Sequence, residues 1–147
     1  MSKTRSIHHI VFATKNRQNT IDPVHKRELY SYIYGILKNK NCFLIRMNGI
    51  SDHIHMLVDI HPSISLSDLV KEVKQSSSLW LRDNPNFPKF DMWGEGYFAE
   101  SIGNEGVESC KQYILNQEEH HGKISLVDEL KNMAYRNGHE WYDKDLA

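Results

Sequence analysis

The segment HIHMLVDI, residues 53–60, alternates between two sets of side chains with a period of two residues. This alternation predicts a β-strand with one face in a hydrophobic core. His53 and His55 share the other face, about 6.5–7 Å apart along the strand. Two imidazoles on a stiff strand can bind one metal ion, although two structural histidines give the same pattern. The side chains expected to face the core are Ile54, Met56, Val58 and Ile60.

The elements around this strand follow the order β-α-β-β-α-β along the chain. The pair Asp22-Pro23 is typical of a helix start, and Ser65 followed by Asp68 resembles a capping box. The short link after Ile50 favours an antiparallel hairpin with the next strand. Strands are expected at residues 6–14, 42–50, 53–60 and 96–102, and helices at residues 23–39 and 66–82.

This order predicts an α+β protein with the ferredoxin-like fold, a four-stranded antiparallel sheet with both crossover helices on one face. The helices would meet the apolar side of the 53–60 strand. The face that carries His53 and His55 would remain free. A chain of 147 residues is long enough for one hydrophobic core, so residues 1–147 are expected to form a single domain.

Additional helices are expected at the C-terminal end of the chain. One spans residues 105–121 with Gly122 after its last turn, and the next follows the cap Ser125 to about Gly138. On the first of them, Tyr113 and Gln117 are four residues apart and therefore share one face. A phenol and an amide are thus expected near the two histidines.

These side chains together form a set suited to phosphodiester chemistry. A divalent cation bound by His53, His55 and the amide oxygen of Gln117 keeps open positions for phosphate oxygens. Tyr113 can attack phosphorus and store the energy of the broken bond in a phosphotyrosine, from which the strand can be rejoined. Each residue alone also fits an ordinary structural role. The combination indicates metal-assisted strand transfer.

The sequence resembles the single-tyrosine HUH transposases, the small enzymes of single-strand insertion sequences of the two-hundred type. The resemblance extends over nearly the whole chain and is most specific in the histidine strand followed by Tyr-x-x-x-Gln. The matching segments, in family order, are IVFATK (10–15), SDHIHMLV (51–58), SLSDLVKEVKQSSS (65–78), WGEGYF (93–98) and YILNQEEHH (113–121).

The resemblance implies a DNA transposase that cuts and rejoins single-stranded DNA at hairpin-marked transposon ends. It implies that His53, His55 and Gln117 bind Mg²⁺ or Mn²⁺, and that Tyr113 becomes the 5′-phosphotyrosine. It also implies a homodimer in which the tyrosine helix of one subunit can serve the histidines of the other.

The formal net charge of −1 means that positive charge for gripping DNA must be local. The expected phosphate contacts are Lys15, Arg17, Lys71, Lys74 and Arg82, for each of which a solvated surface is an equal alternative.

Other residues have two interpretations each. Trp93, Tyr97 and Phe98 either stack on unpaired bases or pack in the core, with packing favoured. His120 and His121 either take part in the site, as metal ligands or proton shuttles, or have no role in it, with no role favoured.

A reducing, cytoplasmic location is expected for this protein. No apolar run approaches the roughly 18 residues that a membrane span needs, and the N-terminal residues do not form a signal peptide. Cys42 and Cys110 are too few and too far apart for a disulfide scaffold or a cysteine zinc site.

The residues alone leave three alternatives to a transposase. A domesticated HUH nicking enzyme would apply the same chemistry to repeated chromosomal hairpins, and the difference lies in the neighbouring DNA. A non-catalytic nucleic-acid-binding module on the same fold would display aromatics on its central strands, where this chain has histidines. A metal-binding regulator would leave Tyr113 and Gln117 without a role.

Overall fold

The computed structural model describes residues 2–120 and 125–141. Its strands form one antiparallel sheet in the order β2-β3-β1-β4. This confirms the predicted α+β, ferredoxin-like fold. The elements, in chain order, are β1 (Ile7–Ala13), the 3-10 turn η1 (Lys15–Arg17), α1 (Lys26–Asn39), β2 (Phe43–Ile50), β3 (His53–Asp59), α2 (Leu66–Arg82), β4 (Phe98–Ser101), the 3-10 turn η2 (Asn104–Gly106), α3 (Val107–Leu115), α4 (Gln117–His120) and α5 (Leu126–Arg136).

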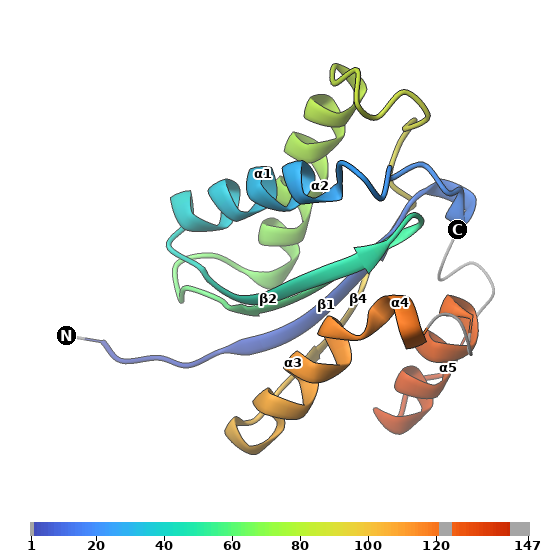
Figure 1. The fold of residues 1–147 in the computed structure, drawn as a ribbon. Coiled ribbons are helices and arrows are strands. Elements are labelled where there is room, and N and C mark those ends of the chain that lie inside the picture. The colour runs from blue at the N-terminus through green and yellow to red at the C-terminus, as the bar shows by residue number, and fades with distance from the viewer. Residues whose placement is uncertain (1, 121–124, 142–147) are drawn as a thin grey trace.

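A helical layer covers each face of the sheet (Figure 1). Helices α1 and α2 lie on one face, and α3, α4 and α5 lie on the other. The main core fills the space between the sheet and the first pair of helices. The largest of its fully buried side chains include Phe12, Ile54, Met56, Leu29, Ile33 and Leu69. Complete burial of side chains of this size stabilises the fold by about 1.5–3 kcal/mol each.

The strand register explains how β3 separates its two sets of side chains. Ile10 of β1 pairs with Met56, and Phe12 pairs with Ile54, so apolar residues meet on the α1–α2 side. His53 and His55 point to the opposite side, as the alternation predicts. That face is not free, however, because α3 to α5 pack over it and both histidines have no exposed surface.

The predicted helix over residues 105–121 is wrong as a single element. Helix α3 ends at Leu115, and α4 begins at Gln117 after a break at Asn116. The amide of Asn48 on β2 donates to the carbonyls of Ile114 and Leu115 at 3.1 and 3.0 Å. These carbonyls are at a helix end, where they lack partners within the helix, and Asn48 supplies one. The predictions for His121 and Gly122 lie outside the described residues.

Other element boundaries differ by a few residues from those predicted. Helix α1 begins at Lys26 and not at residue 23, because the Asp22 carboxylate accepts the Val24 N–H at 2.8 Å and forms a turn first. Strand β4 begins at Phe98, after Gly96 in the left-handed region with φ of 74°. Strand β2 has an irregularity between Leu44 and Arg46, which shifts its register against β3.

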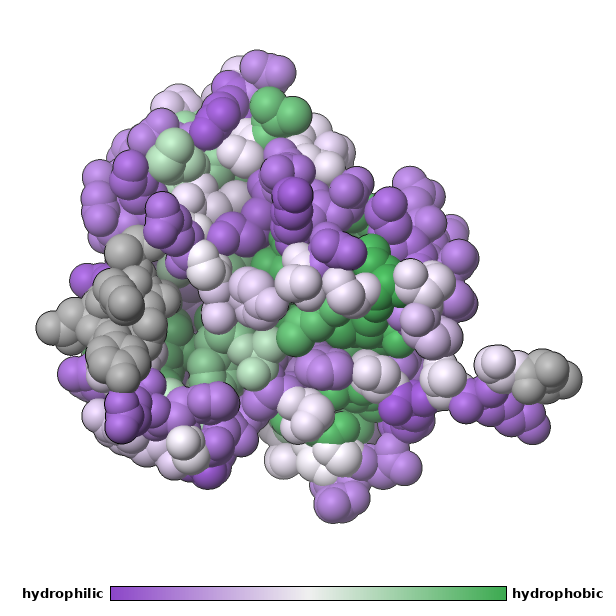
Figure 2. All heavy atoms as spheres, turned by 180° about the vertical axis from the view of Figure 1, so that it is seen from behind, coloured by the Kyte–Doolittle hydropathy of each residue, from purple (hydrophilic) through white to green (hydrophobic). Residues whose placement is uncertain are grey.

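The β4 edge of the sheet lies at the back of the molecule. Seen from behind, apolar side chains gather in the middle of this face, with polar side chains above and below (Figure 2). This distribution follows from the layered architecture, because the outer surfaces of the two helical layers are polar. No helix within residues 2–120 and 125–141 combines the length and apolar character needed to cross a bilayer.

Candidate active site

Strand β3 holds the two predicted histidines on one face, in the middle of the protein. His53 and His55 pair with Ala13 and Val11 of β1 and are completely buried. Their ring centroids are 5.1 Å apart, with the ring planes at 74°. Because β3 is an inner strand with hydrogen bonds on both sides, the backbone under these imidazoles is rigid.

His53 lies between a carboxylate and an amide. Its Nδ1 atom is 2.6 Å from Oδ1 of Asp52, and its Nε2 atom is 3.2 Å from Oε1 of Gln117. A carboxylate only accepts hydrogen bonds, so in a neutral ring Nδ1 would carry the proton and Nε2 would present a lone pair. The amide nitrogen of Gln117 donates to the Tyr113 carbonyl at 3.1 Å, which directs Oε1 toward the histidine. In that tautomer two acceptor atoms would face each other, as they do around a cation.

His55 is the second buried imidazole of the site. Its Nε2 atom is 3.2 Å from Oε1 of Glu129 but has no hydrogen-bond partner among the described residues. Burial lowers the pKa of His55 to about 3, and the nearby Glu129 offsets only part of this shift. The ring is therefore neutral near pH 7, the state in which an imidazole can bind a metal ion.

Glu129 of α5 connects the histidines to the tyrosine. The Tyr113 hydroxyl donates a hydrogen bond to Oε1 of Glu129, the same oxygen that faces His55. The ring centroids of Tyr113 and His55 are 5.7 Å apart. Burial raises the pKa of the Tyr113 phenol, and the hydrogen bond to Glu129 raises it further. The phenol is thus protonated at neutral pH and has a carboxyl group at hydrogen-bonding distance as a proton acceptor.

The donor atoms of this site fit a divalent cation. One ligand atom each from His53, His55 and Glu129 lie within 4.8 Å of one another, and all three residues are buried. The buried Nε2 of His55 has no hydrogen-bond partner within the described chain, which is the state expected of a ligand atom. Gln117 adds an amide oxygen beside His53. Nitrogen and oxygen ligands of this kind suit a first-row or alkaline-earth divalent ion.

The structure brings the predicted His53, His55, Tyr113 and Gln117 together, and it divides the predicted cationic residues. Lys15 and Arg17 follow β1 at the end of the sheet where Thr14 N–H donates to the Asp52 carbonyl at 2.9 Å. The three α2 cations Lys71, Lys74 and Arg82 are on the helix layer across the sheet from the histidines.

Two of these α2 cations hold the loop that follows the helix. The Lys74 ammonium donates to the carbonyls of Gly94 and Gly96 at 2.7 and 3.0 Å, and its burial lowers its pKa. Arg82 Nε donates to the Asp91 carbonyl at 2.7 Å. These contacts give both side chains a structural function.

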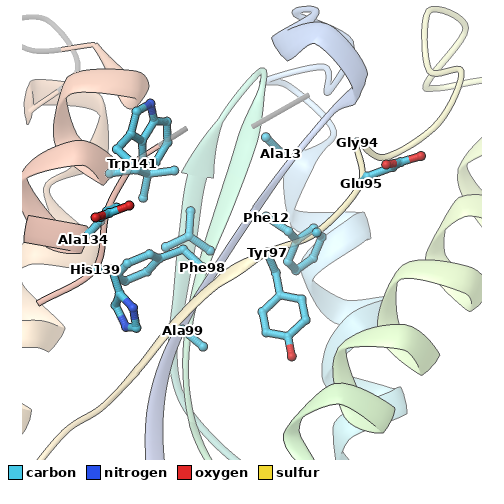
Figure 3. A pocket seen from close by; sticks show the side chains of 14 residues that line it. Phe12, Ala13, Gly94, Glu95, Tyr97, Phe98, Ala99, Ala134, His139 and Trp141 are labelled. Atoms are coloured by element: carbon cyan, nitrogen blue, oxygen red, sulfur yellow. The ribbon is translucent and has the colours of Figure 1, made fainter. Parts of the chain in front are cut away.

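The predicted stacking aromatics lie in different environments. Trp93 is a core residue, as favoured from the sequence, and its indole N–H donates to Ser77 Oγ at 3.0 Å. Tyr97 and Phe98 line a cavity of about 520 Å³ at the β4 edge. Figure 3 shows Phe98 on the side of Ala134, His139 and Trp141, and Tyr97 on the other side of the strand. Another cavity, of about 460 Å³, is lined by Tyr113, Glu129, His9 and Arg136.

Sequence reasoning missed two buried residues of the site, Glu129 and His9. Both left a signal in the sequence. Glu129 interrupts the apolar stripe of Leu126, Leu130 and Met133, and at 3% exposure it is buried together with its partners Tyr113 and His55. His9 has the same strand parity as Val11, so it faces the histidine side of the sheet, where it is 1% exposed.

Comparisons with known proteins agree on one family. The family model described as "Transposase IS200 like" matches residues 2–117, which include both histidines, Tyr113 and Gln117 but not Glu129. The "Transposase for insertion sequence element IS200" of Salmonella typhimurium is 31% identical over 115 residues, covering 75% of this chain and 75% of the relative. The protein with the same description from Salmonella typhi gives the same values.

Two solved structures share the fold. A putative transposase from Deinococcus radiodurans has a TM-score of 0.57 at 22% identity, covering 80% of this chain and 98% of that chain. A REP-associated tyrosine transposase bound to a REP hairpin has a TM-score of 0.64 at 16% identity, covering 100% of this chain and 92% of that chain.

Proposed function

The chain belongs to the family of IS200-like transposases, and from this premise we propose that it cuts and rejoins single-stranded DNA at hairpin-marked ends through a phosphotyrosine on Tyr113. The observation that carries the proposal is the position of the Tyr113 hydroxyl, bonded to Glu129 beside the buried pair His53 and His55. A phenol with its own proton acceptor next to a cation site is suited to attack on phosphorus.

The cleavage step starts with transfer of the Tyr113 hydroxyl proton to Glu129. The phenolate oxygen then forms a bond to the scissile phosphorus, and the bond between phosphorus and the 3′ oxygen breaks. The 3′ oxygen takes up the proton that Glu129 returns and leaves as a hydroxyl group. The DNA stays attached to Tyr113 through its 5′ phosphate. Attack by another 3′ hydroxyl reverses these steps and rejoins a strand without a hydrolytic water.

His53, His55 and Gln117 are the proposed metal ligands, and Mg²⁺ or Mn²⁺ is the proposed ion. A bound ion would polarise the phosphodiester and stabilise the charge on the oxygens of the transition state. Asp52 supports this assignment, because its hydrogen bond to His53 leaves the Nε2 lone pair directed at the site. Glu129 lies close enough to act as a further ligand as well as a proton acceptor.

The proposed substrate is a DNA hairpin with a single-stranded flank. A protein of the same fold has been solved with a REP hairpin, which supports this class of substrate. Lys15 and Arg17 are the phosphate contacts best supported by position, since they lie at the Asp52 end of the sheet. Lys71, Lys74 and Arg82 would contact DNA only on the other side of the molecule.

A homodimer and a cytoplasmic location complete the proposal. The position of Tyr113 next to His55 of its own chain supports an active site built within one subunit, so the dimer would serve to hold two DNA ends. Cys42 and Cys110 are free thiols, as expected in a reducing compartment.

The test is the formation of a covalent adduct between protein and DNA. The protein is incubated with long circular single-stranded DNA and Mg²⁺ or Mn²⁺, then resolved on a denaturing gel beside Tyr113→Phe and a chelator control. We expect a metal-dependent adduct that the Tyr113→Phe protein lacks. Tyr135→Phe is the matched control, because Tyr135 is 61% exposed. Tight hairpin binding with no adduct, including on DNA that flanks the gene, would contradict the proposed chemistry.

A further inference from the structure

His9 connects the buried His55 to a carboxylate of the edge strand β4 on the same face of the sheet. His9 Nε2 is 2.8 Å from His55 Nδ1, and His9 Nδ1 is 3.6 Å from Oε1 of Glu100. His9 and Glu100 are register partners on the neighbouring strands β1 and β4. The two imidazole rings are within 22° of parallel, with centroids 5.0 Å apart. A continuous line of polar groups therefore leads from Glu100 to the candidate metal site.

The partners of Glu100 stabilise its ionised carboxylate form. The Asn137 amide donates to its Oε2 atom at 2.6 Å, and Arg136 is 3.2 Å from Oε1. These partners come from the end of α5, the helix that also carries Glu129. Contact with His9, and then with Asn137 and Arg136, lowers the pKa of Glu100 to about 2. A carboxylate can accept but not donate, so it favours a proton on His9 Nδ1, 3.6 Å away.

This restriction determines where the protons on both rings lie. Because the Glu100 carboxylate faces Nδ1 of His9, a neutral His9 ring carries its proton on Nδ1 and presents a lone pair at Nε2. His55 must then donate from Nδ1 to His9, which leaves the lone pair of His55 on Nε2. That atom faces Glu129 and the candidate metal site. For His53 no second histidine lies in between: the Asp52 carboxylate is 2.6 Å from its Nδ1 atom and favours the same tautomer.

We infer that His9 and Glu100 are positioning residues, which hold His55 in the tautomer that can bind the metal ion. The inference rests on the proposed metal site. Imidazole ligands commonly donate their other N–H to a carboxylate or carbonyl, which sets the tautomer and the ring orientation. Here the neighbouring strand places a histidine in between, because the carboxylate of Glu100 is one strand further from β3.

The experiment measures the tautomer and the metal affinity separately. Long-range nitrogen–proton NMR of the metal-free protein reports which ring nitrogen of His55 carries the proton. Titration with Mn²⁺ alone reports the affinity. The variants are Glu100→Gln, His9→Phe and His9→Gln. The control is Glu108→Gln, which removes one charge from an exposed pair with Lys111.

We expect wild-type His55 to carry its proton on Nδ1. His9→Phe leaves Nδ1 without an acceptor, so the proton should move to Nε2, where Glu129 accepts it. Glu100→Gln should give both tautomers, because an amide can donate or accept. Both changes should weaken Mn²⁺ binding by about 10- to 100-fold. His9→Gln should restore part of the affinity, because its amide oxygen can accept from His55. Glu108→Gln should have no effect.

The outcomes separate this inference from the proposed function. Unchanged tautomer and Mn²⁺ affinity in Glu100→Gln and His9→Phe, with wild-type protein binding Mn²⁺, would overturn the role of His9 and Glu100 alone. Wild-type protein that does not bind Mn²⁺ would contradict the metal site, and the tautomer measurement would still decide whether His9 and Glu100 orient His55. If His9→Phe does not fold, Glu100→Gln still tests whether the contacts from Glu100 through His9 set the tautomer of His55.

Discussion

The Tyr113 hydroxyl donates its hydrogen bond to Glu129, a residue of the neighbouring helix α5 that also faces His55. One carboxyl group is thus shared between a phenol and a metal-ligand candidate. Helix α5 lies beyond residue 117, where the match to the family model ends. Glu129 therefore lies outside the residues that the family model matches.

Glu129→Gln tests the role of this carboxyl group. The amide keeps the size of the side chain but cannot accept and return a proton, so the rate of adduct formation should fall by about 10²- to 10⁴-fold. Hairpin binding, measured by fluorescence anisotropy, should be unchanged. The control is Glu119→Gln on the exposed surface of α4. A wild-type cleavage rate in Glu129→Gln would remove Glu129 from the proposed mechanism.

Mixing inactive subunits tests whether one chain contains the whole site. Helix α3 is bonded through its end to Asn48 of its own sheet, and Tyr113 lies beside its own His55. We therefore expect no cleavage when Tyr113→Phe protein is mixed with His53→Ala protein under conditions of subunit exchange. Recovery of adduct in the mixture would show that a tyrosine serves the histidines of the partner.

Gly49→Ala tests the support under His53. A Cβ atom on Gly49 would lie 2.2 Å from the His53 carbonyl oxygen, which belongs to the paired strand and cannot move freely. We expect the free energy of unfolding in urea to fall by about 1–3 kcal/mol and Mn²⁺ affinity to fall with it. Gly35→Ala is the matched control. Gly35 lies within α1 with open space around its Cα, so alanine there should raise the unfolding free energy by about 0.5–1 kcal/mol.

The neutral state of His55 predicts how the stability of the metal-free protein depends on pH. The folded-state pKa is lowered to about 3, whereas an unfolded histidine titrates near 6.5. Between these values the unfolded chain binds a proton that the folded protein does not, so stability is lost as pH falls. The loss from pH 6.5 to pH 5 should be about 1.5 kcal/mol.

Urea unfolding at a series of pH values measures this loss, with His55→Gln as the variant that should lack it. His139→Gln, on the exposed end of the chain after α5, is the control and should keep the wild-type dependence. Glu100 adds a loss of the same sign only below its ordinary value of 4.5, so the range above pH 5 isolates His55. Equal slopes for wild type and His55→Gln would contradict the prediction.

Several features of the site follow from local patterns in the sequence. The alternation around His53 and His55 predicts a strand with two distinct faces, and the β-α-β-β-α-β order predicts the sheet. The spacing of Tyr113 and Gln117 predicts that they lie together, and the Gln117 amide does donate to the Tyr113 carbonyl at 3.1 Å. These predictions succeed because backbone geometry repeats over two or about four residues, and neighbouring side chains reveal that repeat.

Only the tertiary structure shows that Glu129 reaches Tyr113, that His9 separates His55 from Glu100, and that Asn48 ends α3. It also shows that Lys74 holds loop carbonyls on the other side of the sheet from the histidines. Such contacts join segments far apart in the chain, and the packing of whole helices on the sheet decides them. Local periodicity contains no information about which distant residue will face a given side chain, so the sequence determined the strand and its histidines, and packing determined their partners.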